Sequence, residues 1–335
     1  MIKEAIGQLV EGKDLSYETA LAVMEEIMSG EVSNTLISGY LVALRMKGET
    51  TDEITASAVG MRNKGIKLEH DYDVIEIVGT GGDKSFSFNI STTSAIVASA
   101  AGVKVAKHGN KGVSSKSGAA DVLSALGANI MAEPQVSKKL LDEIGFCFLF
   151  AQKYHSSMKY VGPVRGELGI RTVFNVLGPL TNPAAANLQV LGVYDESLMR
   201  PLAEVLTKLG VKRGLVVFGE DVMDEITVSA PTKICEFGGG EYKDYVITPE
   251  EFGFKRCLKS DLVGGDAQEN AEITKAILNG QKGPKRDAVL LNAGAAIYVY
   301  RNDVTLKEAV RIAEETIDSK KAAAQLEKYI ELSNE

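Results

Sequence analysis

A glycine-rich loop followed by a polar helix start is the first place where this sequence could do chemistry. Gly79–Asp83 contains three glycines in five positions and follows the apolar run Val74–Val78, which predicts a strand. Glycines let backbone N–H groups approach a bulky anion closely. Asn89–Thr92 then opens a predicted helix, whose free N–H groups favour phosphate and whose Ser91 and Thr92 add hydroxyls. We expect an anion site here, with an ordinary glycine turn and N-cap as the alternative.

A second polar loop is the most basic stretch of the chain. Lys107 to Gly118 holds three lysines, a histidine, three serines and three glycines, and it follows a predicted strand at Val103–Lys107. Long polar loops in compact domains are more often functional than not. With Lys104 it forms the densest positive cluster, which indicates a small polyanionic ligand; a merely solvated basic loop is the alternative.

An acidic pair follows a later predicted strand. Asp224 and Glu225 come a few residues after the apolar run Leu215–Phe218. Adjacent carboxylates at a sheet edge suit Mg²⁺, which prefers oxygen ligands and bridges to phosphates. Acidic turns are common, so the pair taken alone remains ambiguous. A nearby phosphate site favours the metal interpretation, because a diphosphate usually binds with its metal.

The elements that position these loops fall into two regions. The first 65 residues show apolar residues at helical spacing in four segments, with predicted N-caps at Ser16, Ser33 and Thr50, the last in a capping box with Glu53. From Asp73 onward short apolar strands alternate with helices, which predicts an α/β domain with a mostly parallel central sheet flanked by helices. Ligands of such sheets bind beyond the carboxyl ends of the strands, where all three loops are expected.

Composition narrows the classes of function. The chain has 335 residues, of which 37 are basic and 45 acidic, a net charge of −8. Such a chain repels nucleic acid and anionic membrane on average, so neither is an expected partner. The cysteines Cys147, Cys235 and Cys257 lie far apart, which favours a cytoplasmic protein without disulfides or structural zinc. Neither a dinucleotide-type GxGxxG nor a GxSxG motif is present.

The motifs taken in order resemble one enzyme family. GTGGD, SFNIST at Ser87–Thr92, KHGN at Lys107–Asn110, SSKSG with Asp121, and PVRGELGIRTVFNVLGPLTNP at Pro163–Pro183 resemble anthranilate phosphoribosyltransferase. His155-Ser156-Ser157-Met158-Lys159 and MDEITVSAPT, which contains Asp224-Glu225, extend the resemblance over nearly the whole chain. The set is highly specific.

The resemblance implies a reaction and a fold. The reaction would be transfer of a phosphoribosyl group from phosphoribosyl diphosphate to the amine of anthranilate, releasing diphosphate, as the second step of tryptophan biosynthesis. Two Mg²⁺ ions per subunit and a homodimer formed through the helices would accompany it. The helical domain would comprise residues 1–70, completed by about 160–182. Residues 71–159 and 183–335 would form the α/β domain that binds the donor.

The resemblance also implies roles for individual residues. Lys107, Asn110 and Arg165 would be catalytic, and the metal ligands would be Ser91, Asp224 and Glu225. Anthranilate would contact Gly79, Asn110, His108, His155 and Arg165. Phosphoribosyl diphosphate would contact Gly79, Gly82, Asp83, Ser87, Asn89, Ile90, Ser91, Thr92, Lys107, His108, Gly109, Asn110, Lys111, Gly112, Val113, Ser114, Ser115 and Ala119.

Small departures and two rival functions stay open at this point. Lys111 stands where an arginine is common and loses its planar fork. Ala119 replaces a frequent serine, which puts a hydroxyl contact to the donor in doubt. Ser87 replaces a frequent threonine, and Ser156-Ser157 replace a frequent proline-alanine pair. The rivals are a pyrimidine nucleoside phosphorylase of the same fold and a non-enzymatic relative that binds nucleic acid through the lysine loop.

Overall fold

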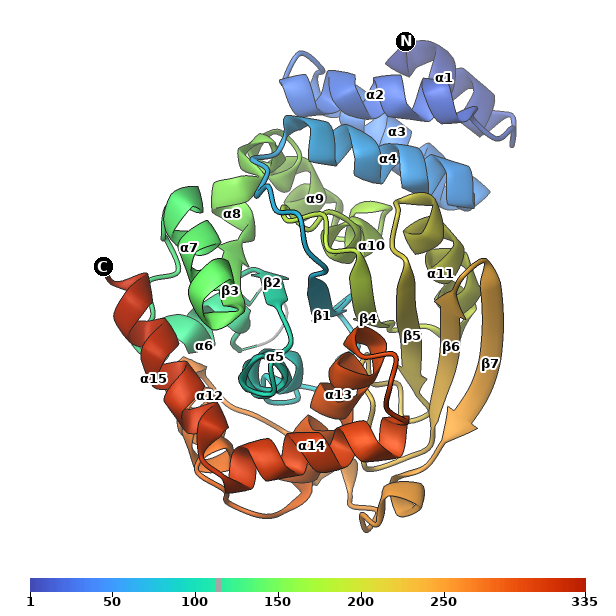
Figure 1. Ribbon diagram of the computed structural model, residues 1–335. Helices are drawn as coiled ribbons and strands as arrows, with labels where there is room; N and C mark the ends of the chain where they lie inside the picture. Colours follow the sequence, from blue (N-terminus) through green and yellow to red (C-terminus); the bar gives the residue numbers. More distant parts are fainter. Residues whose placement is uncertain (113–115) are drawn as a thin grey trace.

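The computed structural model describes residues 1–112 and 116–335, which form a helical bundle seated on an α/β body (Figure 1). The bundle consists of α1 (Ile2–Val10), α2 (Tyr17–Ser29), α3 (Asn34–Lys47) and α4 (Thr51–Lys64). Two of the three predicted N-caps are present. Ser16 accepts from the Thr19 N–H, and Thr50 and Glu53 form the capping box. Ser33 precedes α3 as predicted but makes no side-chain cap bond.

Seven strands form one sheet in the order β3-β2-β1-β4-β5-β6-β7. The first five pair in parallel, as predicted: β1 (Ile75–Gly79), β2 (Val105–Gly109), β3 (Phe146–Phe150), β4 (Leu188–Gly192) and β5 (Arg213–Gly219). β6 (Thr232–Gly238) and β7 (Glu241–Ile247) add an antiparallel hairpin that the sequence analysis did not predict. The fold class is therefore confirmed, with a mixed edge.

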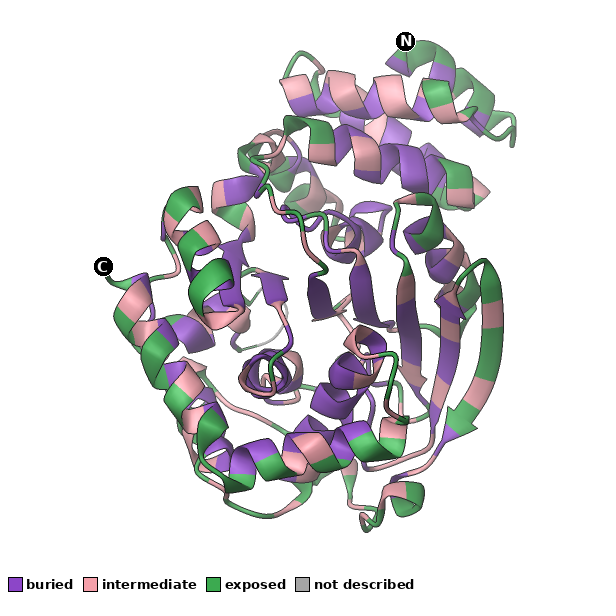
Figure 2. Ribbon diagram, viewed as in Figure 1, coloured by how far each residue is buried: buried purple, intermediate pink, exposed green. Residues whose placement is uncertain are grey.

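Helices cover both faces of the sheet. The remaining α-helices are α5 (Ile90–Ala100), α6 (Ala119–Ala125), α7 (Pro134–Ile144), α8 (Ala151–Tyr154), α9 (Gly162–Leu168), α10 (Phe174–Leu177), α11 (Met199–Lys208), α12 (Ala267–Leu278), α13 (Pro284–Tyr300), α14 (Leu306–Asp318) and α15 (Lys321–Ser333). Short 3₁₀ turns are η1 (Ser156–Tyr160), η2 (Gly178–Leu180), η3 (Glu196–Leu198), η4 (Pro249–Phe252) and η5 (Lys259–Leu262). Figure 2 shows the inner strands buried and the edge strand β7 largely exposed, with α14 and α15 exposing their outer faces.

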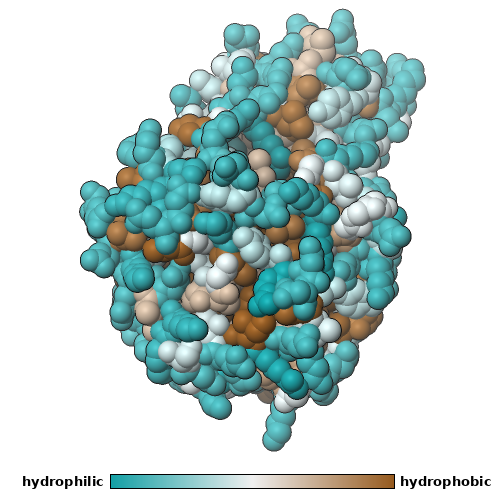
Figure 3. Space-filling view, viewed as in Figure 1, coloured by the Kyte–Doolittle hydropathy of each residue, from teal (hydrophilic) through white to brown (hydrophobic). Residues whose placement is uncertain are grey.

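Neighbouring residues of one strand belong to different cores. Val190 packs with the core that contains α5 and α13, whereas Leu191 packs with the core that contains α11 and the bundle. This alternation follows from the two-residue period of a strand buried on both faces. The face seen in Figure 3 is mostly hydrophilic, with small hydrophobic patches. Among the described residues, no helix is long and apolar enough to cross a membrane.

The bundle draws part of its core from later in the chain. Val161, Val164, Val173 and Phe174 are buried in the same cluster as the apolar residues of α1 to α4. This cluster continues into α11 and one face of the sheet, so the two regions share apolar packing. The division into residues 1–70 with about 160–182, and 71–159 with 183–335, stays a prediction.

Candidate functional site

The three loops singled out from the sequence meet at the carboxyl edge of the parallel strands. The first follows β1, the second follows β2, and the loop with the acidic pair follows β5. Asp224 lies over the ends of β1 and β4, where a Cβ at Gly79 or Gly192 would collide with it. Glycine at both strand ends is what lets this loop cross so close to the sheet.

Three carboxylates gather beneath the first loop. Asp224 accepts the Gly81 N–H at 2.6 Å and lies beside the carboxylate of Asp83. Burial, and then the charge of Asp83, raise the pKa of Asp224 to about 7. Burial and Asp224 raise the pKa of Glu225 well above its usual value, although Lys107 and a bond from the Ser91 N–H oppose this. A bound cation would relieve the repulsion.

This donor set fits a hard divalent ion. Its oxygens are carboxylates, with the Ser91 backbone beside Glu225. Among the described residues, no group of three or more aspartates, glutamates, cysteines or histidines is placed so that it could hold a metal ion by itself. Mg²⁺ typically takes only one or two protein carboxylates and completes its shell with water and substrate phosphates. The arrangement therefore suits Mg²⁺ bound together with a phosphorylated ligand.

The loop that carries the acidic pair is held by side chains that the sequence analysis missed. The buried amide of Asn292, on α13, accepts the Ile226 N–H at 3.0 Å and donates to the Ile226 carbonyl at 2.8 Å. Asp221 accepts from Thr227 at 3.0 Å and also from Ser229. Val222 has a left-handed φ of 67°, a conformation that costs free energy. Contacts such as these offset that cost. These contacts orient Asp224 and Glu225.

Lys107 is a buried cation in the middle of β2. Only 2% of it is exposed, and its Nζ donates to the His108 carbonyl at 3.2 Å. Burial lowers its pKa, while Glu76, Glu225 and Asp224 act to keep it charged. Lys104, grouped with it from the sequence, lies just before β2 at the opposite edge of the sheet, 4.3 Å above the Tyr72 ring. It is not part of the site, because it lies at the amino end of the strand.

Polar atoms without partners collect at the start of α5. Asp83 Oδ2, Asn89 Oδ1 and Thr92 Oγ1 are buried, with no hydrogen-bond partner among residues 1–112 and 116–335. Buried polar groups are almost always satisfied, so such a group of exceptions indicates ligand contacts. The preceding loop is strained as well, since Lys84 and Phe86 have φ of 58° and 52°. Ile90 is the first residue of the helix, and Ser87 and Ser91 are half-buried beside these atoms.

A single carboxylate holds the two ends of the second loop together by hydrogen bonds. The Asp121 carboxylate accepts the Gly112 N–H at 2.7 Å and the Gly118 N–H at 2.9 Å. Asn110 is exposed and its Oδ1 accepts the Lys111 N–H at 2.8 Å. Lys111 is also exposed, and Ala119 starts α6 next to Gly109. The predicted site residues Val113, Ser114 and Ser115 lie outside the described residues.

Two histidines and an arginine form a third part of the site. The His108 and His155 rings lie 5.2 Å apart and edge-on, and burial lowers the pKa of each, so both are neutral at pH 7. His108 Nε2 and His155 Nδ1 are buried and have no hydrogen-bond partner in the part of the chain that the structure describes. Arg165, on α9, is half-buried with its guanidinium 5.6 Å from the Phe174 ring. Among the described residues no carboxylate lies within 4 Å of it.

Glu76 is a buried acid that the sequence analysis did not single out. It lies in β1 and accepts the His108 N–H at 3.2 Å, and the Asn182 side chain lies close to its carboxylate. Burial raises its pKa to about 7, against the opposing effects of Lys107 and Asn182. The sequence did offer a signal for Glu76: it is a charged residue inside the run Val74–Val78, and buried parallel strands are otherwise apolar. Glu76 supplies negative charge beside Lys107.

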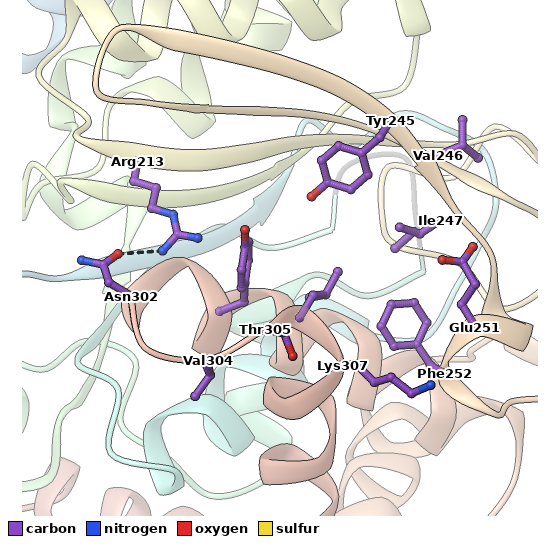
Figure 4. Close-up of a pocket in the computed structure, with 12 residues that line it drawn as sticks. Arg213, Tyr245, Val246, Ile247, Glu251, Phe252, Asn302, Val304, Thr305 and Lys307 are labelled. Carbon is purple, nitrogen blue, oxygen red and sulfur yellow. Dashed lines mark hydrogen bonds between the residues drawn. The ribbon is translucent and has the colours of Figure 1, made fainter.

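A wide cleft elsewhere on the molecule lacks this chemistry. It has a volume of about 920 Å³ and opens between the β6–β7 hairpin and the start of α14 (Figure 4). Two of its polar groups have partners: Arg213 donates to Asn302 at 2.7 Å, and Tyr245 donates to Glu236, beside the cleft on β6, at 3.0 Å. We therefore place the functional site at the carboxyl edge, where polar groups lack partners among residues 1–112 and 116–335, rather than in this cleft.

Comparison with known proteins gives concordant matches over the whole chain. Residues 71–323 match the glycosyl transferase family a/b domain, and residues 3–65 match the glycosyl transferase family helical bundle domain. The anthranilate phosphoribosyltransferase of Lachnoclostridium phytofermentans is 65% identical over 334 residues, covering 100% of this chain and 99% of that protein. The Methanobrevibacter smithii enzyme of the same name is 61% identical, covering 100% of both.

Solved structures agree with the sequence matches. The anthranilate phosphoribosyltransferase from Thermus thermophilus superimposes with a TM-score of 0.94 at 45% identity, covering 99% of each chain. The Saccharomyces cerevisiae enzyme, solved in complex with PRPP (phosphoribosyl diphosphate) and Mg, gives a TM-score of 0.92 at 29% identity, covering 99% of this chain and 98% of that one.

Replacing Asp224 by asparagine should stabilise the metal-free protein at high pH. The pKa of Asp224 rises from 3.8 in the unfolded chain to about 7 in the fold. Between these values the folded state keeps a proton that the unfolded state has lost, so wild-type stability falls as pH rises through this window. At about 1.4 kcal/mol per pKa unit, we expect Asp224→Asn to gain on the order of 2–4 kcal/mol at pH 8.

Urea denaturation at pH 4, 6 and 8 in EDTA measures this effect. The gain should be near zero at pH 4 and largest at pH 8. Asp71→Asn is the matched control, because Asp71 is exposed and should give no pH-dependent difference. An Asp224→Asn protein that loses stability equally at all three pH values would show that this carboxylate carries no buried charge.

Proposed function

The chain belongs to the anthranilate phosphoribosyltransferases, and from that membership we propose which of its residues carry out the reaction. The enzyme transfers the phosphoribosyl group of phosphoribosyl diphosphate to the amine of anthranilate, giving N-(5-phosphoribosyl)anthranilate and diphosphate, the second step of tryptophan biosynthesis. The one observation that carries our assignment is the group of unpaired buried polar atoms. Five predicted site residues have one: Asp83, Asn89, Thr92, His108 and His155.

We propose that the donor lies over the loops that follow β1 and β2. The unpaired Asn89 and Thr92 side chains at the start of α5 support contacts to its phosphates. Gly79, Gly82, Ser87, Ile90 and Ser91 would line the first loop. The second loop would close over the donor through Gly109, Asn110, Lys111 and Gly112, with Ala119 at its base, and through Val113, Ser114 and Ser115.

Mg²⁺ belongs with the diphosphate, and we propose two ions per subunit. The carboxylates of Asp224 and Glu225, together with Ser91, would hold them. When bound, Mg²⁺ supplies positive charge that stabilises the departing diphosphate. Its use in this family is supported by the yeast complex with PRPP and Mg. Loading the site also requires Asp224 and Glu225 to be ionised, which the raised pKa values oppose until the cation arrives.

We propose that Arg165 anchors the anthranilate carboxylate. A guanidinium binds a carboxylate bidentately, and the lack of any carboxylate within 4 Å of Arg165 among the described residues leaves its donors available. Asn110 and Gly79 would flank the reacting amine. His108 and His155 would line the channel as neutral rings, so they offer hydrogen bonds without adding a second charge that competes for the carboxylate.

Catalysis in this arrangement is mainly electrostatic. Displacement at the ribose C1 develops positive charge on the sugar and negative charge on the leaving diphosphate. Lys107, held charged by Glu76 and the acidic pair, would face the leaving group and is preorganised by burial. The amine of anthranilate is already a nucleophile and requires no strong base. Arg165 and Asn110 supply orientation, which is the other large contribution.

The rival functions lose support. A nucleoside phosphorylase is disfavoured by family membership and by the arginine placed for a carboxylate. A nucleic-acid-binding role required an exposed lysine loop on the surface. Lys107, however, is buried and Lys104 lies at the opposite edge, which leaves Lys111 and Lys116 as exposed lysines of that loop among the described residues.

Turnover with pure components tests the function. Protein, MgCl₂, phosphoribosyl diphosphate and anthranilate should together consume anthranilate fluorescence and release an equal amount of diphosphate. Excess EDTA should stop the reaction, because the leaving group then loses its counter-charge. Orotate or uracil in place of anthranilate is the control and should give no diphosphate. Absence of anthranilate loss in the complete mixture would refute the assignment.

Arg165→Ala tests the anchor. Losing a charge-assisted carboxylate contact and the orientation it gives should cost on the order of 2–4 kcal/mol, or roughly 30- to 1000-fold in kcat/KM for anthranilate. The KM for phosphoribosyl diphosphate should change little. Arg301→Ala, which removes a half-buried arginine paired with Asp303 at 2.7 Å, is the control. Unaltered anthranilate kinetics in Arg165→Ala would remove this residue from the acceptor site.

We further propose that the enzyme works in the cytoplasm as a homodimer formed through the helical bundle. Val10 and Met46 in α1 and α3 are 73% and 83% exposed, which supports an apolar contact surface. Buried, unpaired Cys147 and Cys235 agree with a reducing compartment. Sedimentation velocity at micromolar concentration should give the mass of two chains, and a single-chain species throughout would exclude the dimer.

A further inference from the structure

Arg171 contacts the Gly79–Asp83 loop, the donor loop. It lies in the same segment as Arg165, the acceptor segment. It lies between Gly169, which ends α9, and α10, six positions after Arg165. Its Nη2 donates to the Gly82 carbonyl at 2.6 Å, and its guanidinium lies 3.7 Å from the Tyr194 ring centroid. A guanidinium stacked on a ring and bonded at its edge has a well-defined orientation.

The nearest polar partner of Arg171 is the loop, although its charge also helps to lower the pKa of Asp195. Among residues 1–112 and 116–335, no carboxylate lies within 4 Å of its guanidinium. The charge-assisted bond to Gly82 is therefore its strongest polar contact in the described structure. A surface arginine usually contacts solvent or a carboxylate. Arg171 is instead half-buried against a glycine carbonyl.

Three successive residues of the donor loop are each held by a different part of the fold. Thr80 donates its N–H to the Gly192 carbonyl at 2.9 Å and accepts the Tyr194 N–H, which ties it to the end of β4. Gly81 is held by Asp224 from the metal loop. Gly82 is held by Arg171 alone among the described side chains. Of these three contacts, the one between Arg171 and Gly82 links the donor loop to the acceptor segment.

Packing continues this link toward Arg165. Val173 and Phe174 follow Arg171 closely and are buried in the same core as Val164 and the bundle helices. The Arg165 guanidinium lies 5.6 Å from the Phe174 ring. A shift of α9 on acceptor binding is therefore transmitted through packed side chains to Arg171 and the Gly82 carbonyl, and a shift of the donor loop is transmitted in reverse.

We propose that Arg171 is a positioning residue that couples the two substrate sites, so that each substrate tightens the binding of the other. The inference rests on the proposed roles of Arg165 and the Gly79–Asp83 loop. Coupling of this kind is reciprocal and typically amounts to at least a roughly 5-fold change in affinity. Neither substrate needs to touch Arg171 for the effect to occur.

Equilibrium binding measures the coupling directly. The dissociation constant of phosphoribosyl diphosphate in MgCl₂ is determined by calorimetry with and without saturating 2-methylbenzoate. This acid keeps the carboxylate and shape of anthranilate but has a methyl group in place of the amine, so no transfer can occur. We compare wild type with Arg171→Met and Arg171→Lys. Arg200→Met is the matched control, because Arg200 also stacks on a tyrosine, 4.0 Å from the Tyr242 ring, on α11.

In wild type and Arg200→Met, the acid should tighten donor binding about 5-fold or more. In Arg171→Met the ratio should fall to near one, with Arg171→Lys intermediate because it keeps the charge but loses the planar stack. A ratio in Arg171→Met equal to that of wild type would overturn the inference, as would an equal loss in Arg200→Met or an uncoupled wild type. These results are distinct from failure of the proposed function, which the turnover assay of wild type reports separately.

Discussion

Mutual repulsion among three clustered carboxylates is the constraint on which the rest of this molecule depends. Asp83, Asp224 and Glu225 are brought together where two glycine-ended strands leave room for a crossing loop. Lys107 is the cation that the fold itself supplies nearby. The remaining charge must come from a ligand, so the protein gives up stability at this edge in order to bind metal and diphosphate. Asn292 and Asp221 hold the loop against that repulsion.

Much of the fold followed from the sequence because its patterns are local. Helical periodicity and capping residues predicted α1 to α4, and apolar runs predicted the five parallel strands. The parallel arrangement in turn predicted that the three loops would share one edge, which the structure confirms. The antiparallel β6–β7 hairpin was missed because β7 is an edge strand rich in charged residues, so its pattern resembles a polar loop.

The parts of the site that escaped sequence reasoning depend on long-range contacts. Asn292 reaches Ile226 across 66 positions, and no local pattern distinguishes it from other helical asparagines. Glu76 was passed over because one acid in an apolar run has no partner in sequence. Lys104 was grouped with Lys107 by sequence proximity, although three positions along a strand span about 10 Å and end on the opposite face. The roles of individual residues remain tied to family resemblance.

The late completion of the bundle core has a consequence for synthesis on the ribosome. Helices α1 to α4 emerge first, yet Val161, Val164, Val173 and Phe174 fill part of the cluster that buries their apolar faces. Until these later residues have been translated, those faces have no complete partner. The nascent chain therefore exposes an apolar helical surface for several seconds, because translation typically adds about 5–20 residues per second. During that interval molecular chaperones and neighbouring nascent chains compete for the bundle.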